Sequence, residues 1–189
     1  KLDFSPFDIY QYIGEEKRSC FLEEQEGNIN VHQKIIETMT AAEREVLIFS
    51  GDLSWTEASQ QGVPLLKAYE ILAKKGIPIK VIANIDLNSL PKVQKINAIN
   101  HQLGKDLIEI RHCKQPLRAF IVDDHSLRIK EKYFLERTAT DQYLFYCIAD
   151  EDWIKWLQKV FWHFYSTSID AKKRIDDLKT VKEIKTQPN

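Results

Sequence analysis

Short runs of branched apolar residues alternate along this chain with segments whose apolar residues recur at helical spacing. Residues 45–50 and 77–84 read as strands, the second rich in isoleucine and valine. Between them, residues 63–75 carry leucine, tyrosine and alanine on one helical face, and Gly76 can end that helix. The same pattern continues with a helix and a short strand over residues 91–103 and 107–111. Strands and helices in this alternation predict a parallel sheet covered by helices.

The chain then changes to a pattern typical of antiparallel strands. Residues 117–122 and 127–133 are separated by turn-forming residues, which predicts a hairpin, and residues 142–149 predict a further strand. We therefore expect an α/β fold with a mixed sheet sandwiched between helices, parallel in its first part and antiparallel in its last.

The two ends of the chain differ in composition from the middle. Residues 1–27 predict a short helix followed by a charged loop, and residues 28–168 predict the main domain, which begins with a helix capped by Asn30. Residues 169–189 predict a charged helix that either packs as an arm on a second subunit or frays. Because the first residue is Lys1, we expect this chain to be part of a longer protein.

Composition excludes several classes of protein. The 189 residues carry a net charge of −1, which gives no overall attraction for DNA or an anionic membrane. Three cysteines without C-x-x-C spacing indicate reduced thiols in a cytoplasm and no metal site. No run reaches transmembrane length, and no glycine-rich nucleotide loop is present. We predict a cytoplasmic protein with no metal, cofactor or membrane contact.

An aromatic helix is expected from residue 150 onward. One apolar stripe comprises Trp153, Leu157, Val160, Phe161 and Phe164. This stripe favours a core helix that covers the sheet. Part of the same surface could instead form a dimer interface, since aromatic residues are favoured anchors, and the candidates are Trp156, Trp162 and Tyr165.

The segment from Pro116 to Asp123 resembles the H-x-K-x-x-x-x-D signature of the phospholipase D superfamily, with two of its three functional residues changed. Pro116 stands at the position of the nucleophilic histidine, Arg118 at that of the lysine, and Asp123 at that of the aspartate. Proline has no side-chain atom that can attack phosphorus, so the resemblance implies no catalytic residue here.

A second alignment starts at the literal H-x-K of His112 and Lys114. Its third member would be Ala119, which does not fit the signature. Pro116 would also interrupt a single strand in this alignment, whereas it is tolerable as the first residue of a strand. We prefer the alignment on Pro116, which places the aspartate at the end of a strand.

Other positions bear on the same resemblance. Lys130 and Glu131 stand where the superfamily has a small pair that lets phosphate approach the backbone, and a glutamate there would repel a phosphodiester. The sequence of residues 48–51 is similar to that of a strand in the superfamily, and residues 66–81 are similar to its segment in which a helix leads into the next strand. Over roughly residues 30–165, the order of elements resembles one half of a phospholipase D fold.

Basic residues near this segment suggest an anion site. Arg118 could hold phosphate or carboxylate through two hydrogen bonds, or pair with Glu131 across the hairpin. Arg111 and Lys130 add positive charge, and His112 could be a remnant base or a structural residue. Alternation places Lys130 on one face of its strand with two neighbouring cations, Arg128 and Lys132. That face is either solvated or part of an anion pocket.

A polar loop follows the first strand of the expected sheet. Ligands of open α/β sheets bind at the carboxyl ends of strands, which makes Asp52, Ser54 and Trp55 candidate lining residues. Trp55 could equally cap the sheet.

The resemblance also implies a function. Superfamily members with one signature copy work as homodimers, and degenerate relatives occur in prokaryotic transcription regulators of the TrmB type. The leading hypothesis is an inactive sensor and dimerisation domain that binds a small anionic or polar effector and contacts DNA only through a domain absent from this chain. The alternatives are a metal-independent phosphodiesterase or nuclease that uses His112 and Lys114, and a nonenzymatic nucleic-acid-binding protein that uses the basic surface between Arg111 and Lys132.

Overall fold

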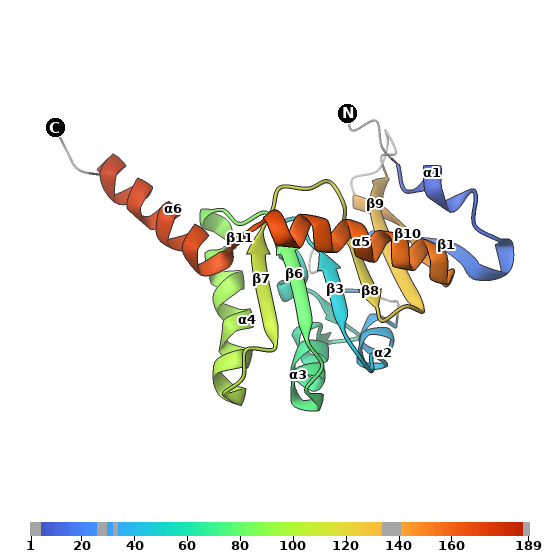
Figure 1. Cartoon of the computed structure of the whole chain (residues 1–189), viewed down its shortest axis with the longest axis horizontal. Coiled ribbons are helices and arrows are strands. Elements are labelled where there is room, and N and C mark those ends of the chain that lie inside the picture. Colours follow the sequence, from blue (N-terminus) through green and yellow to red (C-terminus); the bar gives the residue numbers. More distant parts are fainter. Residues whose placement is uncertain (1–4, 26–29, 32–33, 134–140, 187–189) are drawn as a thin grey trace.

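A mixed sheet of eight strands forms the centre of the molecule (Figure 1). The computed structural model describes residues 5–25, 30–31, 34–133 and 141–186. Across the sheet the strands follow the order β1-β10-β9-β8-β3-β6-β7-β11. Their bounds are β1 (Arg18–Gln25), β3 (Val46–Phe49), β6 (Ile79–Ala83), β7 (Ile108–His112), β8 (Ala119–Val122), β9 (Ser126–Tyr133), β10 (Asp141–Ile148) and β11 (Ile169–Asp170). A small second sheet contains β2 (Asn30–Val31), β4 (Ser59–Gln60) and β5 (Val63–Pro64).

The direction of the strands agrees with the sequence pattern. β3 pairs in parallel with β6, and β6 pairs in parallel with β7. The pairs β3 with β8, β8 with β9, β9 with β10 and β10 with β1 are all antiparallel. The predicted mixed sheet, parallel in its first part and antiparallel in its last, is therefore confirmed.

Helices cover both faces of this sheet. Their bounds are α1 (Phe7–Tyr10), α2 (Ile35–Thr40), α3 (Leu66–Lys75), α4 (Leu90–Leu103), α5 (Glu151–Thr167) and α6 (Ala171–Thr186), with short 3-10 helices η1 (Glu15–Lys17), η2 (Ser54–Glu57) and η3 (Leu87–Ser89). Successive residues of a strand point to opposite faces. Ile48 accordingly belongs to the apolar cluster under α2, α3 and α4, whereas Leu47 and Phe49 belong to the cluster under α5.

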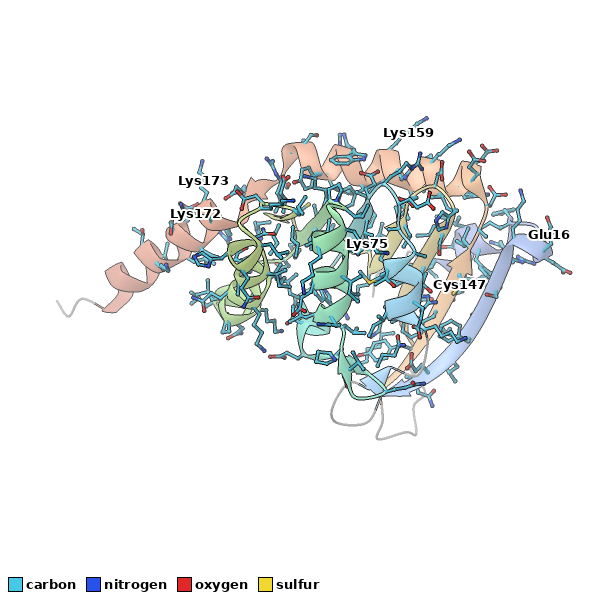
Figure 2. All side chains as sticks on the ribbon, turned by 90° about the horizontal axis from the view of Figure 1, so that it is seen from below. Glu16, Lys75, Cys147, Lys159, Lys172 and Lys173 are labelled. Atoms are coloured by element: carbon cyan, nitrogen blue, oxygen red, sulfur yellow. The ribbon has the colours of Figure 1, made fainter. Side chains whose placement is uncertain are left out.

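α5 begins at a well-formed cap. The carboxylate of Asp150 accepts hydrogen bonds from the backbone N–H groups of Asp152 and Trp153, at 3.1 and 3.2 Å. Ile154, Leu157, Phe161 and Tyr165 are its buried residues. Lys159 lies on the opposite, exposed side and points away from the body (Figure 2). This arrangement fits a helix that buries one apolar stripe on the sheet.

α6 projects from one end of the molecule (Figure 1). Ile175 and Leu178, near its start, pack against the cluster under α4, and Val181 is half exposed. No helix in the described residues combines the length and the apolarity needed to cross a membrane.

Two predicted segments differ from the structure. The charged loop expected after residue 12 contains β1, whose eight residues pair with β10. This pairing uses backbone groups, so the charged side chains that hid the strand do not prevent it. The helix expected from Asn30 begins only at Ile35, because Asn30 pairs with Ser59 in the small sheet.

Candidate ligand-binding site

A cavity of about 140 Å³ lies where the carboxyl end of β3 meets the start of β8. These ends meet because the two strands are antiparallel and Phe49 pairs with Ala119. Its polar lining consists of Ser50, Asp52, Ser54 and Trp55 after β3, and Arg118, Arg128 and Lys130 from the hairpin of β8 and β9. Side chains of α2 and α3 also line it.

The structure brings five of the seven predicted ligand-binding residues to this cavity: Asp52, Ser54, Trp55, Arg118 and Lys130. Ser50 and Arg128 also line it and were not among those candidates. Strand alternation in the sequence places Arg128 on the same face of its strand as Lys130. This pattern could have identified Arg128 as a lining residue. Whether these residues hold a ligand remains a prediction.

Arg118 lies over the backbone of Gly51. A Cβ atom at Gly51 would come within 3.1 Å of Nε and Nη2 of Arg118, so glycine allows this close approach. Among the described residues, the guanidinium has no hydrogen-bond or ion-pair partner. The alternative pair with Glu131 is not formed, because Glu131 accepts hydrogen bonds from the hydroxyls of Ser5 and Tyr146, both at 3.0 Å.

Glu131 also does not line the cavity. It lies between Lys130 and Lys132 on β9, so its side chain points to the other face of the sheet. The expectation that a glutamate here would repel an anion is therefore wrong for this cavity.

Arg128 and Lys130 lie against aromatic rings. The guanidinium of Arg128 is 5.4 Å from the ring centre of Phe120 and 5.6 Å from that of Phe21. Its Nη1 atom is buried and has no hydrogen-bond partner among the described residues. Nζ of Lys130 is 3.6 Å from the ring centre of Tyr143. Aromatic rings thus contact both of these β9 cations at the cavity.

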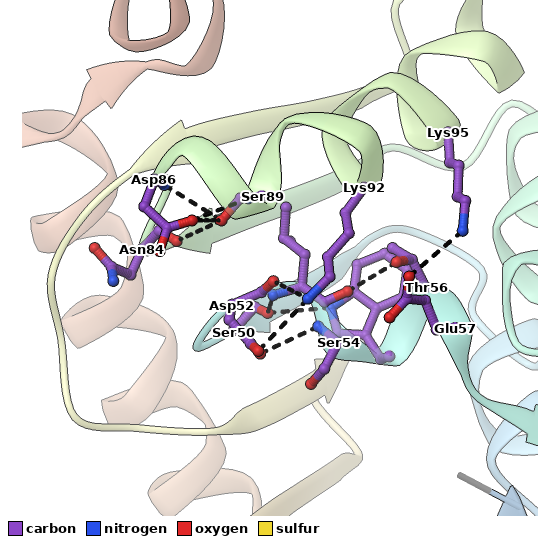
Figure 3. Close-up of polar contacts among 12 residues, drawn as sticks. Ser50, Asp52, Ser54, Thr56, Glu57, Asn84, Asp86, Ser89, Lys92 and Lys95 are labelled. Carbon is purple, nitrogen blue, oxygen red and sulfur yellow. Dashed lines mark hydrogen bonds and ion pairs between the residues drawn. The ribbon is translucent and has the colours of Figure 1, made fainter. Parts of the chain in front are cut away.

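The loop after β3 is fixed by a polar network (Figure 3). Nε1 of Trp55 donates to Oγ of Ser50 at 3.1 Å, and the Trp55 ring stacks on Tyr69 with centroids 4.3 Å apart. Nζ of Lys92 lies 3.2 Å from the carbonyl oxygen of Asp52 and 3.6 Å from its carboxylate. Burial alone would raise the pKa of Asp52, but hydrogen bonds from Ser54 and the charge of Lys92 lower it.

The other two predicted residues, Arg111 and His112, lie away from this cavity. Nη1 of Arg111 donates to the carbonyl oxygens of Tyr165 and Ser168, at 3.3 and 3.2 Å. Nδ1 of His112 accepts a hydrogen bond from the backbone N–H of Ile85 at 2.9 Å. Both side chains therefore connect β7 to neighbouring segments.

His112 should make the stability of the fold depend on pH. Burial, and then the charge of Arg174, lower its pKa below the ordinary value of 6.5. The unfolded chain therefore binds the proton more readily than the folded one, and the free energy of unfolding should fall as pH decreases from about 6.5 toward the lowered pKa. Urea titrations at about pH 7.5 and about pH 5.5 measure this difference.

The matched variants are His112→Gln and His101→Gln. His101 is exposed on α4, so its replacement should keep the wild-type pH dependence, whereas His112→Gln should reduce it. Equal pH dependence in wild type and His112→Gln would contradict the assignment to His112.

Asp123 lies at the opposite end of β8 from Arg118 and the cavity. It follows β8 and adopts a left-handed conformation, with φ of 50°. Its carboxylate accepts hydrogen bonds from the backbone N–H groups of Glu43, Arg44 and Glu45, each at 2.9 Å. The position of Asp123 at a strand end agrees with the alignment on Pro116, and its contacts give it a structural role.

The proposed interface residues differ in exposure. Trp156 and Trp162 are 48% and 38% exposed. Tyr165 is buried, and its hydroxyl donates to Glu109 at 2.7 Å. Of these three candidates, the two tryptophans therefore have exposed surface that a second subunit could cover directly, whereas Tyr165 does not.

Comparisons with known proteins identify the fold. A scan against models of protein families finds no match, and a search of curated proteins finds none. Among solved structures, the archaeal chromatin protein TrmBL2 is similar with a TM-score of 0.54 and 16% identity, over 87% of this chain. This chain spans 58% of TrmBL2.

Two bacterial structures are similar over nearly their whole length. The phospholipase D family member Nuc from Salmonella typhimurium has a TM-score of 0.56 and 11% identity, over 82% of this chain and 98% of Nuc. NucT from Helicobacter pylori has a TM-score of 0.52 and 12% identity, over 82% of this chain and 99% of NucT. At these identities the likeness establishes the fold alone. This chain has a phospholipase D-like α/β fold.

Proposed function

We propose that this chain is a catalytically inactive sensor and dimerisation domain of a cytoplasmic prokaryotic transcription regulator. It binds a small anionic or polar effector in the cavity beside β3 and β8. A homodimer sets the spacing of the DNA-binding parts, which lie outside this chain.

The observation that carries this proposal is the cationic lining of the cavity, which includes Arg118. Arg118 and Arg128 line the cavity, and within the described residues neither the guanidinium of Arg118 nor Nη1 of Arg128 has a hydrogen-bond partner. Pro116, two residues before Arg118, offers no nucleophile. A site with cations but no nucleophile at this position can hold an anion without cleaving it.

The likeness to TrmBL2 supports the regulatory part of the proposal. TrmBL2 is described as an archaeal chromatin protein with a novel mode of DNA binding, and this chain is similar to 58% of it. The net charge of −1 favours a role for this chain in sensing rather than in direct DNA contact. The exposed Trp156 and Trp162 provide a surface for the second subunit.

Hydrolysis of a chromogenic phosphodiester, in the presence of a metal chelator, tests the absence of catalysis. We expect no turnover above the buffer rate for the wild-type chain. Turnover that disappears in His112→Ala would instead support the metal-independent phosphodiesterase.

DNA binding by the isolated chain tests the sensory assignment. We expect little affinity for duplex DNA at physiological salt. Appreciable affinity that falls steeply with salt would favour the nonenzymatic nucleic-acid-binding protein.

A further inference from the structure

The charges around the cavity favour an anion. Three cationic side chains, Arg118, Arg128 and Lys130, line it together with one carboxylate, that of Asp52. Lys92 lies 3.6 Å from that carboxylate, and the backbone N–H of Ser54 donates to it. Lys92, which does not line the cavity, therefore already offsets the negative charge of Asp52, and Arg118 and Arg128 can act on a ligand.

The hairpin places these cations on one face. The backbone N–H of Lys130 donates to the carbonyl oxygen of Arg118, and Phe120 pairs with Arg128. Arg118 is therefore directly opposite Lys130 and diagonal to Arg128, a spacing of about 7–8 Å that two long side chains can bridge to one anion.

Two donors in the cavity have capacity to bind such an anion. Nη1 of Arg128 is buried without a hydrogen-bond partner in the described part of the chain. Oγ of Ser50, also buried, accepts hydrogen bonds from Trp55 Nε1 and the backbone N–H of Leu53, so its own proton is available for donation. A guanidinium and a hydroxyl suit the oxygens of a carboxylate.

The rest of the lining is apolar and aromatic. Ile48, Met39, Phe120 and Phe145 line the cavity together with Trp55. Its volume of about 140 Å³ is close to that of an apolar cavity of about 150 Å³ that is known to hold benzene. A compact inorganic anion would leave this apolar wall uncovered, and a neutral ligand would leave the buried Nη1 atom of Arg128 without a charged acceptor.

We infer that the ligand of this cavity is a small aromatic carboxylate, with its ring against the apolar wall and its carboxylate bound by Arg118 and Arg128. This inference rests on the proposed ligand-binding function and adds the chemical class of the ligand.

Titration calorimetry with benzoate, benzamide and inorganic phosphate tests this inference on the whole chain. We expect benzoate to bind at least about tenfold more tightly than benzamide, which has the same ring but no charge, and more tightly than phosphate. Arg118→Met and Arg128→Met should each weaken benzoate binding about tenfold or more, because each removes a charge-assisted hydrogen bond.

Arg44→Met is the matched control, because the Arg44 side chain pairs with Asp124 at the opposite end of β3. It should leave benzoate affinity unchanged. Thermal unfolding shows whether each variant is folded. Because Arg118 is exposed, we expect Arg118→Met to fold, and it tests the inference even if Arg128→Met does not fold.

The inference would be overturned by a lack of benzoate binding, by equal binding of benzamide, or by unchanged benzoate affinity in Arg118→Met. Tighter binding of phosphate than of benzoate would also overturn it, but this result would still agree with the proposed function as a noncatalytic anion sensor. Hydrolysis of a phosphodiester by the same protein would contradict the proposed function itself, so the two failures are distinguishable.

Discussion

Asp123→Ala is expected to lower the free energy of unfolding by about 3–5 kcal/mol. The side chain of Asp123 is 4% exposed and accepts three backbone N–H groups from residues 43–45, which lead into β3. Alanine would leave these donors without their acceptor. It would also have to adopt the left-handed conformation of Asp123, which asparagine and aspartate tolerate better.

Asp124→Ala is the control for this change. Asp124 is the next residue in the chain, and its carboxylate pairs with Arg44 at the surface, at 2.8 Å. Surface ion pairs contribute about 0–1 kcal/mol, so this variant should remain close to wild type. Urea unfolding of both variants measures the difference, and equal losses would contradict the structural role of Asp123.

The contribution of Asp123 should also disappear in acid. Burial would raise its pKa, but the hydrogen bonds from Glu43, Glu45 and Arg44 lower it below the ordinary value of 3.8. The unfolded chain therefore takes up the proton first as pH falls. Stability that is present above about pH 4 should be lost as pH decreases through the lowered folded-state pKa, and Asp123→Ala should reduce this acid dependence.

The periodic elements of this fold could be predicted because their own residues define them. β6 is a branched run, and Gly76 and Gly104 end α3 and α4 in the left-handed conformation expected there. β1 was missed because its charged residues hide the strand pattern, and only its partner β10 defines it. Local pattern thus identifies central elements better than an edge strand.

The candidate site could be predicted in part for a similar reason. Arg118 and Lys130 meet because a hairpin brings neighbouring residues together. Arg111 and His112 are close to Arg118 in sequence, but their strand β7 lies three positions from β8 in the sheet. At the usual strand spacing this is about 14 Å, and the order of strands cannot be read from the residues of one strand.

The candidate ligand-binding residue Arg118 and the structural residue Asp123 lie at opposite ends of β8. Asp123 lies at the end of β8, where it holds the residues that enter β3, whereas Arg118 lies before the start of β8. Substitutions at the two ends should therefore have different effects. Changes at Asp123 should reduce stability, and changes at Arg118 should alter ligand binding in a protein that remains folded.

Phe161→Ala should have an equally large effect on stability, with a loss of about 3–5 kcal/mol. Phe161 is a fully buried residue of α5, and its ring packs edge-to-face on Phe49 of β3 with centroids 5.2 Å apart. It also lies against Tyr165, with centroids 5.6 Å apart. Alanine would leave a cavity between α5 and the sheet, and urea unfolding measures the loss.

Trp156→Ala is the matched change on the outer side of the same helix. Trp156 is 48% exposed, so its removal should cost the monomer about 1 kcal/mol or less. If this surface joins two subunits, the variant should shift the protein toward monomers in light scattering and reduce the dependence of unfolding on protein concentration. An unchanged dimer in Trp156→Ala would place the interface elsewhere. A small change in the free energy of unfolding of Phe161→Ala would contradict the packing of α5 on the sheet. The pair of variants therefore separates the core side of α5 from the side proposed for dimerisation.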